Sequence, residues 1–200
     1  MLYGIVKWIA WVILKIFFWF RIEGQENVPK DGRLVVAGNH VSYLDPAVIG
    51  AGMPRRVYFM AKAELFTIPV LGALIRGLGA FPVQRGGADR KALGRALQVL
   101  QEEKVLGIFP EGTRAEEGER LPGQSGAAAL ALKTGANILP VAVVGTEKVL
   151  SKRHFFRFSR VTLKIGTVIP VEKETKLHKD NVMELTTKVM ENIENLLEER

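Results

Sequence analysis

The stretch NHVSYLD, residues 39–45, contains two side chains that could together remove a proton from a hydroxyl group. A neutral imidazole such as that of His40 is the usual base near neutral pH. A carboxylate such as that of Asp45, placed on the other ring nitrogen, would fix the tautomer and stabilise the imidazolium that forms. The spacing alone fits equally well a loop histidine beside a helix-capping aspartate, so both interpretations stand at this point.

Basic side chains follow three other apolar runs. The stretch FPEGTR, residues 109–114, combines a glycine turn, a hydroxyl and Arg114, which can hold an oxyanion or phosphate through backbone N–H groups and a guanidinium. GAFPVQR, residues 79–85, ends in Arg85, and Lys62 follows the run 57–60. Each cation alone is typical of a solvated surface; together they favour an anion site.

The elements that must position these residues alternate between apolar runs and amphipathic segments. Strands are expected at residues 34–37, 57–60, 81–83, 105–109, 138–144 and 161–165. Helices are expected after Asp45, within 65–78, after Asp89, over 127–133 and after Asn181. This alternation predicts an α/β domain around a largely parallel central sheet flanked by helices. Ligands bind at the carboxyl ends of such strands, so His40, Arg85 and Glu111 should share one edge.

Local rules also predict how three of these helices begin and which faces they bury. Asp45 before Pro46 is typical of an N-cap, and so is Asp89. Asn181 with Glu184 matches a capping box. The expected buried stripes are Leu93, Ala96, Leu97 and Leu100 in one helix, and Val182, Leu185, Val189, Ile193, Leu196 and Leu197 in the other.

Composition excludes several classes of protein. The chain has 200 residues, 48% hydrophobic and 24% charged, which is typical of a folded domain and not of a disordered or fibrous chain. It contains no cysteine, so disulfides and thiolate chemistry are excluded. Its 3 histidines lack ligand-like spacing, and neither a Walker loop, a nucleophile elbow nor a dinucleotide fingerprint is present. We therefore expect no metal and no cofactor.

The first twenty residues, MLYGIVKWIAWVILKIFFWF, contain all 3 tryptophans and two charges, Lys7 and Lys15. On a helical wheel these lysines lie about 80° apart, which leaves one narrow polar edge. That pattern favours a helix in the plane of a membrane interface, with both lysines toward lipid phosphates, over a full crossing. The first hundred residues also hold 13 Lys and Arg against 6 Asp and Glu, so they account for the entire net charge of the chain, +7. We expect an anchor at 1–24 and one domain at 25–200.

A second basic stretch, residues 152–160, mixes four Lys and Arg with three Phe. This mixture suits contact with a membrane or an amphipathic edge ahead of a strand, and more weakly the stacking of single-stranded nucleic acid. No nucleic-acid-binding motif accompanies it, so nucleic acid is not expected as a partner.

Four ordered blocks resemble those of the glycerolipid acyltransferases, in particular the lysophosphatidic acid acyltransferases with their HxxxxD motif. The blocks are NHVSYLD at 39–45, GAFPVQR at 79–85, FPEGTR at 109–114 and LPVA at 139–142. The resemblance implies that His40 activates the acceptor hydroxyl and that Asp45 supports it. It also implies that the glycerophosphate is bound by Lys62, Arg85, Glu111, Gly112, Thr113 and Arg114.

The resulting hypothesis is a 1-acylglycerol-3-phosphate O-acyltransferase of phospholipid biosynthesis. It would move a fatty acyl group from acyl-CoA or acyl-carrier protein to lysophosphatidic acid, giving phosphatidic acid, on the cytoplasmic face of the cell membrane. Two alternatives remain: an acyltransferase for another acceptor, such as glycerol-3-phosphate or a lysophospholipid, and a non-catalytic membrane lipid-binding protein.

Overall fold

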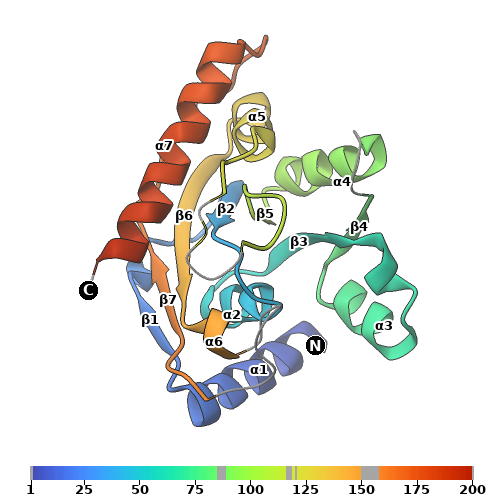
Figure 1. The fold of residues 1–200 in the computed structure, drawn as a ribbon. Helices are drawn as coiled ribbons and strands as arrows, with labels where there is room; N and C mark the ends of the chain where they lie inside the picture. Colours follow the sequence, from blue (N-terminus) through green and yellow to red (C-terminus); the bar gives the residue numbers. More distant parts are fainter. Residues whose placement is uncertain (1, 85–88, 116–118, 120, 150–157, 200) are drawn as a thin grey trace.

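A seven-stranded sheet forms the centre of the molecule, in the order β1-β7-β6-β2-β5-β3-β4. The computed structural model describes residues 2–84, 89–115, 119, 121–149 and 158–199 (Figure 1). The strands are β1 Arg21–Glu23, β2 Leu34–Gly38, β3 Val57–Lys62, β4 Phe81–Val83, β5 Val105–Ile108, β6 Asn137–Val144 and β7 Thr162–Ile165. All neighbouring strands are parallel except β6 and β7. The expected α/β architecture with a largely parallel sheet is confirmed.

Helices cover both faces of the sheet. They are α1 Leu2–Phe18, α2 Asp45–Gly52, α3 Pro69–Gly77, α4 Arg90–Gln101, α5 Gly126–Thr134, α6 Thr146–Val149 and α7 Lys179–Glu198, with two 3₁₀ turns, η1 Gln25–Asn27 and η2 Ala63–Phe66. One core forms between the sheet and α1, α2 and α6, and the other between the sheet and α4, α5 and α7. Side chains of β2 alternate between the two cores, which explains its uninterrupted apolar sequence.

Three of the local expectations need correction. Helix α7 begins at Lys179, so the capping box at Asn181 does not form; instead the Asn181 amide donates to Glu174 Oε1 at 2.7 Å. In α4, Asp89 caps the helix as expected, accepting from the backbone of Lys91 and Ala92, but the buried stripe differs because Leu93 is exposed. In α7 the buried stripe is also narrower than expected, because Leu197 is exposed, whereas the partial helix expected within 65–78 is found as α3.

Helix α1 packs on α2 through one narrow face and exposes the rest. Leu14 and Phe18 are buried in the core, whereas Ile5, Trp8 and Ile16 are more than half exposed. No helix in the described ranges is long and apolar enough to cross a bilayer. The helix ends at Phe18. Strand β1 pairs with β7 in the sheet, although it lies within residues 1–24, the segment expected to be the anchor.

The two lysines of α1 differ in burial, which the helical wheel did not indicate. Lys7 turns toward the protein and donates to the carbonyl of Met53 just beyond the end of α2, and burial lowers its pKa. Lys15 stays exposed, with its ammonium 5.6 Å from the centre of the Trp11 ring. Lys7 faces the protein because the packing of α1 on α2 determines which side of α1 is turned inward. A helical wheel contains no information about that packing.

Candidate active site

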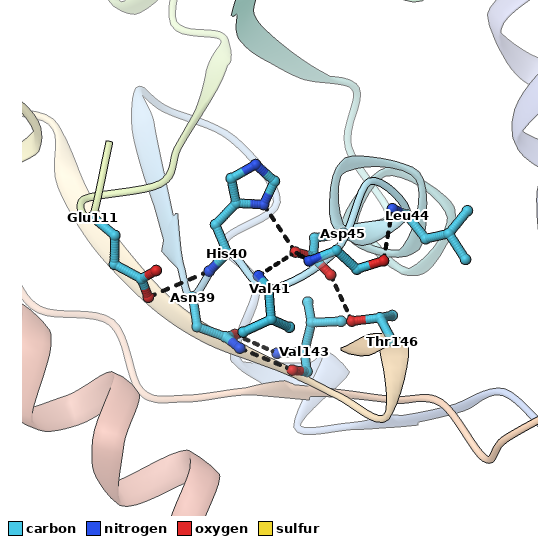
Figure 2. A network of polar contacts seen from close by, with 9 residues as sticks. Asn39, His40, Val41, Leu44, Asp45, Glu111, Val143 and Thr146 are labelled. Atoms are coloured by element: carbon cyan, nitrogen blue, oxygen red, sulfur yellow. Dashed lines mark hydrogen bonds and ion pairs between the residues drawn. The ribbon is translucent and has the colours of Figure 1, made fainter. Parts of the chain in front are cut away.

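His40 and Asp45 meet in the loop that joins β2 to α2 (Figure 2). His40 Nδ1 lies 2.9 Å from Asp45 Oδ2, and the same oxygen accepts the backbone N–H groups of Val41 at 2.8 Å and Ser42 at 2.7 Å. Both side chains are buried, Asp45 completely. The loop therefore folds around the aspartate, which holds the imidazole by one nitrogen.

The sequence predicted that Asp45 caps its own helix, but in the structure it does not. It is the first residue of α2, preceded by Leu44, and its carboxylate turns back toward the loop. Its second oxygen, Oδ1, accepts the hydroxyl of Thr146 at 2.6 Å, from the first residue of α6. Because both oxygens are occupied, the carboxylate can rotate little, and the position of the imidazole is correspondingly fixed.

The backbone of His40 is held by the loop that follows β5. Its N–H donates to Glu111 Oε1 at 3.3 Å, and its carbonyl accepts the Ala115 N–H at 2.8 Å. The preceding residue, Asn39, bonds β6 in both directions, accepting from the N–H of Val143 at 2.7 Å and donating to its carbonyl at 3.0 Å. The base is thus fixed to both strands that flank β2.

A stack of three rings supports the imidazole. The ring of His40 lies parallel to that of Phe109, with centroids 4.1 Å apart, and Phe109 lies 5.8 Å from Phe59. Gly107 makes room for this arrangement, since a Cβ there would come within 2.2 Å of the Phe59 ring. Figure 2 shows the second ring nitrogen of His40 on the side away from Asp45, where it is placed to take a proton from a substrate.

Glu111 in this site has a raised pKa. Burial raises its pKa to about 7, opposed by the hydrogen bond from His40 N–H and assisted by the negative charges of Asp45 and Glu119. Its second oxygen, Oε2, is buried and has no hydrogen-bond partner among the described residues. Glu111 therefore supports the main chain of His40 and leaves one buried oxygen available.

The rest of the FPEGTR loop turns sharply beside His40. Gly112 has φ +69°, and a Cβ there would meet the side chain of Gln124 at 2.3 Å, so only glycine fits. The guanidinium of Arg114 lies 3.7 Å from the centre of the Tyr43 ring, and its buried Nε finds no acceptor in the described ranges. Thr113 is exposed. This loop therefore presents a donor, Arg114, beside the His40–Asp45 pair.

Lys62 and Arg85 are the two cations expected further along this edge. Lys62 ends β3, exposed and 3.1 Å from Glu64, and no contact joins it to His40 in the portion of the chain described. Its strand is separated from β2 by β5, a distance of about 10 Å at the usual strand spacing. Arg85 lies outside the described residues. The structure therefore confirms a shared edge for His40, Glu111 and Lys62, and direct contact only between His40 and Glu111.

Four residues that matter for this geometry were not identified from the sequence: Asn39, Phe109, Tyr43 and Thr146. Three of them lie inside the recognised blocks, where only neighbouring residues had been assigned roles. Thr146 lies 101 residues from Asp45 and could have been found only by the rule that strand ends converge, since it follows β6. The fourth block, by contrast, is core: Leu139, Val141 and Ala142 are fully buried.

The arrangement is suited to one kind of chemistry. A buried imidazole held by a carboxylate can deprotonate a hydroxyl, and a nearby guanidinium can hold an anion. No cluster of three or more His, Asp or Glu that could hold a metal occurs among the residues described.

Comparison with known proteins defines the class. The family model described as "Acyltransferase" matches residues 20–144, which include the His40–Asp45 pair and the FPEGTR loop, and the chain belongs to this family.

Within that class, two of the similar proteins carry the name "1-acyl-sn-glycerol-3-phosphate acyltransferase". The protein of Borreliella burgdorferi is 30% identical over 177 residues, covering 84% of this chain and 71% of its own. That of Bacillus subtilis is 31% identical over 156 residues, with coverages of 78% and 76%. The solved structure of the lysophosphatidic acid acyltransferase PlsC from Thermotoga maritima matches with a TM-score of 0.81 at 27% identity, covering 99% of this chain and 80% of that one. This protein is accordingly an acyltransferase.

Proposed function

We propose that this acyltransferase moves a fatty acyl group from a thioester, acyl-CoA or acyl-carrier protein, onto the free hydroxyl of lysophosphatidic acid, giving phosphatidic acid. The observation that carries this proposal is the buried His40–Asp45 pair beside the FPEGTR loop. The printed names of the relatives support the acceptor.

The mechanism follows from the hydrogen bonds at His40. Its Nε2 takes the proton of the acceptor hydroxyl as the oxygen attacks the thioester carbonyl. Nδ1–H meanwhile donates to Asp45 Oδ2, which stabilises the imidazolium. The tetrahedral intermediate then collapses: the C–S bond breaks, the C–O bond stays, and the thiolate takes the proton from Nε2. No acyl-enzyme intermediate and no cofactor is needed in this scheme.

The acceptor phosphate is assigned to the cations at the same edge of the sheet. Arg114 supports this role best, because its buried Nε has no acceptor among the described residues and its guanidinium already lies over the Tyr43 ring. Lys62 and Arg85 are proposed to reach the phosphate from the β3 and β4 side, and Gly112 and Thr113 to contribute the turn and a hydroxyl. Glu111 is proposed to position the acceptor site by holding the His40 backbone.

The proposed location is the cytoplasmic face of the cell membrane, with α1 lying in the interface as the anchoring segment. Support comes from the outer face of α1, which exposes Leu2, Ile5, Ile9, Ile13 and Ile16. Two further apolar residues are exposed at the start of α3, Ile68 just before the helix and Val70 within it, and Gly77 at the other end of α3 lies against Leu2. Such an apolar face on an amphipathic helix is typical of interfacial binding.

An acceptor panel tests the reaction. Purified full-length chain in lipid vesicles would receive acyl-CoA or acyl-carrier protein with lysophosphatidic acid, glycerol-3-phosphate or a lysophospholipid, and products would be identified by mass. We expect phosphatidic acid from lysophosphatidic acid alone. Turnover of another acceptor would overturn the acceptor assignment, and no acceptor-dependent thioester consumption would indicate a lipid-binding protein.

The anchor needs a gentler perturbation than deletion, because Leu14 and Phe18 belong to the core. Replacing Ile9 and Ile16 by Ser should lower vesicle partitioning at least tenfold, since each isoleucine contributes about 1.5 kcal/mol or more when buried. Met183→Ser on α7 is the matched control, being similarly exposed on a distant helix. Unchanged sedimentation of the double variant would contradict the proposed role of α1.

A further inference from the structure

A hollow of about 460 Å³ lies between α1 and the carboxyl end of α2, at the opposite end of α2 from Asp45. On the α1 side its lining residues are Gly4, Lys7, Trp8, Trp11 and Lys15. These fall within about 100° of the helical wheel, along the edge between the face packed on α2 and the exposed apolar face. Ile22, Gln25 and Ala51 close the other side.

The hollow is positively charged. Lys7 and Lys15 both line it, and none of the described residues that line it is acidic. The Lys7 ammonium is half-buried, with one acceptor, the Met53 carbonyl, among the described residues. Two of its three N–H donors therefore remain for a ligand. Lys15 leans back over Trp11, as side chains on a helix lean toward the N-terminus, and this brings its charge closer to Lys7.

The interior has room for a ligand because α1 carries a glycine there. A Cβ added at Gly4 would meet nothing within 4 Å. Glycine in a helix costs about 1 kcal/mol relative to alanine. Gly4 thus leaves open space at the amino-terminal end of the hollow, about one helical turn from Lys7.

The position of the hollow relative to the exposed face indicates the source of the ligand. On a helical wheel of α1 the exposed isoleucines cluster around one direction, and Lys15 points about 120° away from the centre of that cluster. A helix lying in the interface with this face in the acyl chains therefore holds Lys15 above its axis, at the depth of the lipid phosphates. Trp8 and Trp11 beside it are the side chains that prefer this depth.

We propose that this hollow binds the phosphate headgroup of an anionic membrane lipid, as a site separate from the His40–Asp45 pair. The inference rests on the proposed membrane association and adds to it: the anchoring helix recognises a headgroup as well as an apolar layer. Lys7 and Lys15 bind the phosphate oxygens, and the tryptophans flank the headgroup.

Intrinsic fluorescence offers a direct assay, since the 3 tryptophans of the chain are Trp8, Trp11 and Trp19. In a Trp19→Phe background, emission reports only the two that line the hollow. This chain would be titrated with vesicles of phosphatidylcholine alone, or with one fifth phosphatidylglycerol, and separately with inorganic phosphate. The ratio of the two partition coefficients measures the anionic preference.

Three variants separate a site from general charge attraction. Lys15→Gln should lower the anionic preference about fivefold, the effect of about 1 kcal/mol for a lysine at an anionic surface. Lys188→Gln on α7, exposed and distant, makes the same change of charge and should leave it unaltered. Gly4→Leu places an apolar side chain in the hollow without changing charge: general attraction predicts equal or stronger binding, whereas a site predicts loss of the anionic preference.

Each outcome decides the question. Loss of preference in both Lys15→Gln and Gly4→Leu, with no response to inorganic phosphate alone, supports a lipid headgroup site. Wild-type preference in Gly4→Leu overturns the site, and a response to inorganic phosphate without vesicles overturns the lipid as its source. Failure of every chain to bind either vesicle is a different result, because it overturns the proposed membrane association itself.

Discussion

Replacing Asp45 by Asn removes the charge next to His40 and keeps the shape of the side chain. Two backbone N–H groups, those of Val41 and Ser42, point at one carboxylate oxygen, so they should select the amide oxygen for that position. That oxygen still accepts from His40 Nδ1–H, and the amide N–H₂ then faces the Thr146 hydroxyl, which can accept. We therefore expect the tautomer and the loop to be retained.

The loss in rate follows from the missing charge. A carboxylate and an imidazolium whose charges are about 4 Å apart interact by about 4 kcal/mol at an effective dielectric constant near 20. A hydrogen bond to a charged group contributes about 1.5–3 kcal/mol net. These contributions correspond to a decrease in kcat of between about 10-fold and about 10³-fold. KM for the acceptor should change little, because Asp45 is fully buried behind His40.

The measurement is the steady-state rate of thiol release from acyl-CoA with lysophosphatidic acid, for purified full-length chains in vesicles. Asp180→Asn on α7 makes the same substitution at an exposed site and should behave as the original chain. Thermal unfolding of both variants checks that the fold is intact. A kcat for Asp45→Asn within threefold of the original would refute the reasoning that this carboxylate stabilises the imidazolium.

Three further changes test the surroundings of the pair. Thr146→Val should lower kcat about tenfold without changing KM, and Thr146→Ser should restore it, because the hydroxyl donates to Asp45 Oδ1; equal rates for Val and Ser would contradict this. For Glu111, with a pKa raised from 4.5 to about 7, the folded state keeps a proton that the unfolded chain loses, so stability should fall by up to about 3 kcal/mol as pH rises from 4.5 to 7. Denaturant titrations should show that Glu111→Gln removes this part of the pH dependence, and an unaltered slope would show the assignment to be wrong. Gly107→Ala should displace Phe59 and thereby lower kcat. A core variant elsewhere with the same loss in melting temperature should lose less kcat, and equal losses in parallel assays would contradict the role of the ring stack.

Local signals in the sequence predicted what depends on neighbours along the chain. The uninterrupted apolar run of β2 reflects burial on both faces, and Asp89 caps α4 because its carboxylate reaches the N–H groups two and three residues on. The order of strands and helices was likewise enough to predict the parallel sheet and the edge where His40 meets Glu111.

Contacts that the helix and strand patterns do not contain, some of them between distant segments, decided the rest. Asp45 next to Pro46 has the local signature of a cap, but the loop N–H groups and Thr146 occupy its carboxylate instead. Asn181 bonds Glu174 rather than capping α7. Lys7 turns inward because α1 docks on α2 and offers it the carbonyl of Met53. None of these partners can be identified from spacing along the chain.

The role of His40 as the base is tested most directly by His40→Ala, assayed by acceptor-dependent thiol release from acyl-CoA in vesicles. General base catalysis typically contributes about 10²- to 10⁴-fold, and we predict a loss in kcat of at least 10²-fold with vesicle binding and thermal unfolding close to those of the original chain. A folded His40→Ala protein that turned over lysophosphatidic acid at a rate near the original would show that this imidazole does not take the proton.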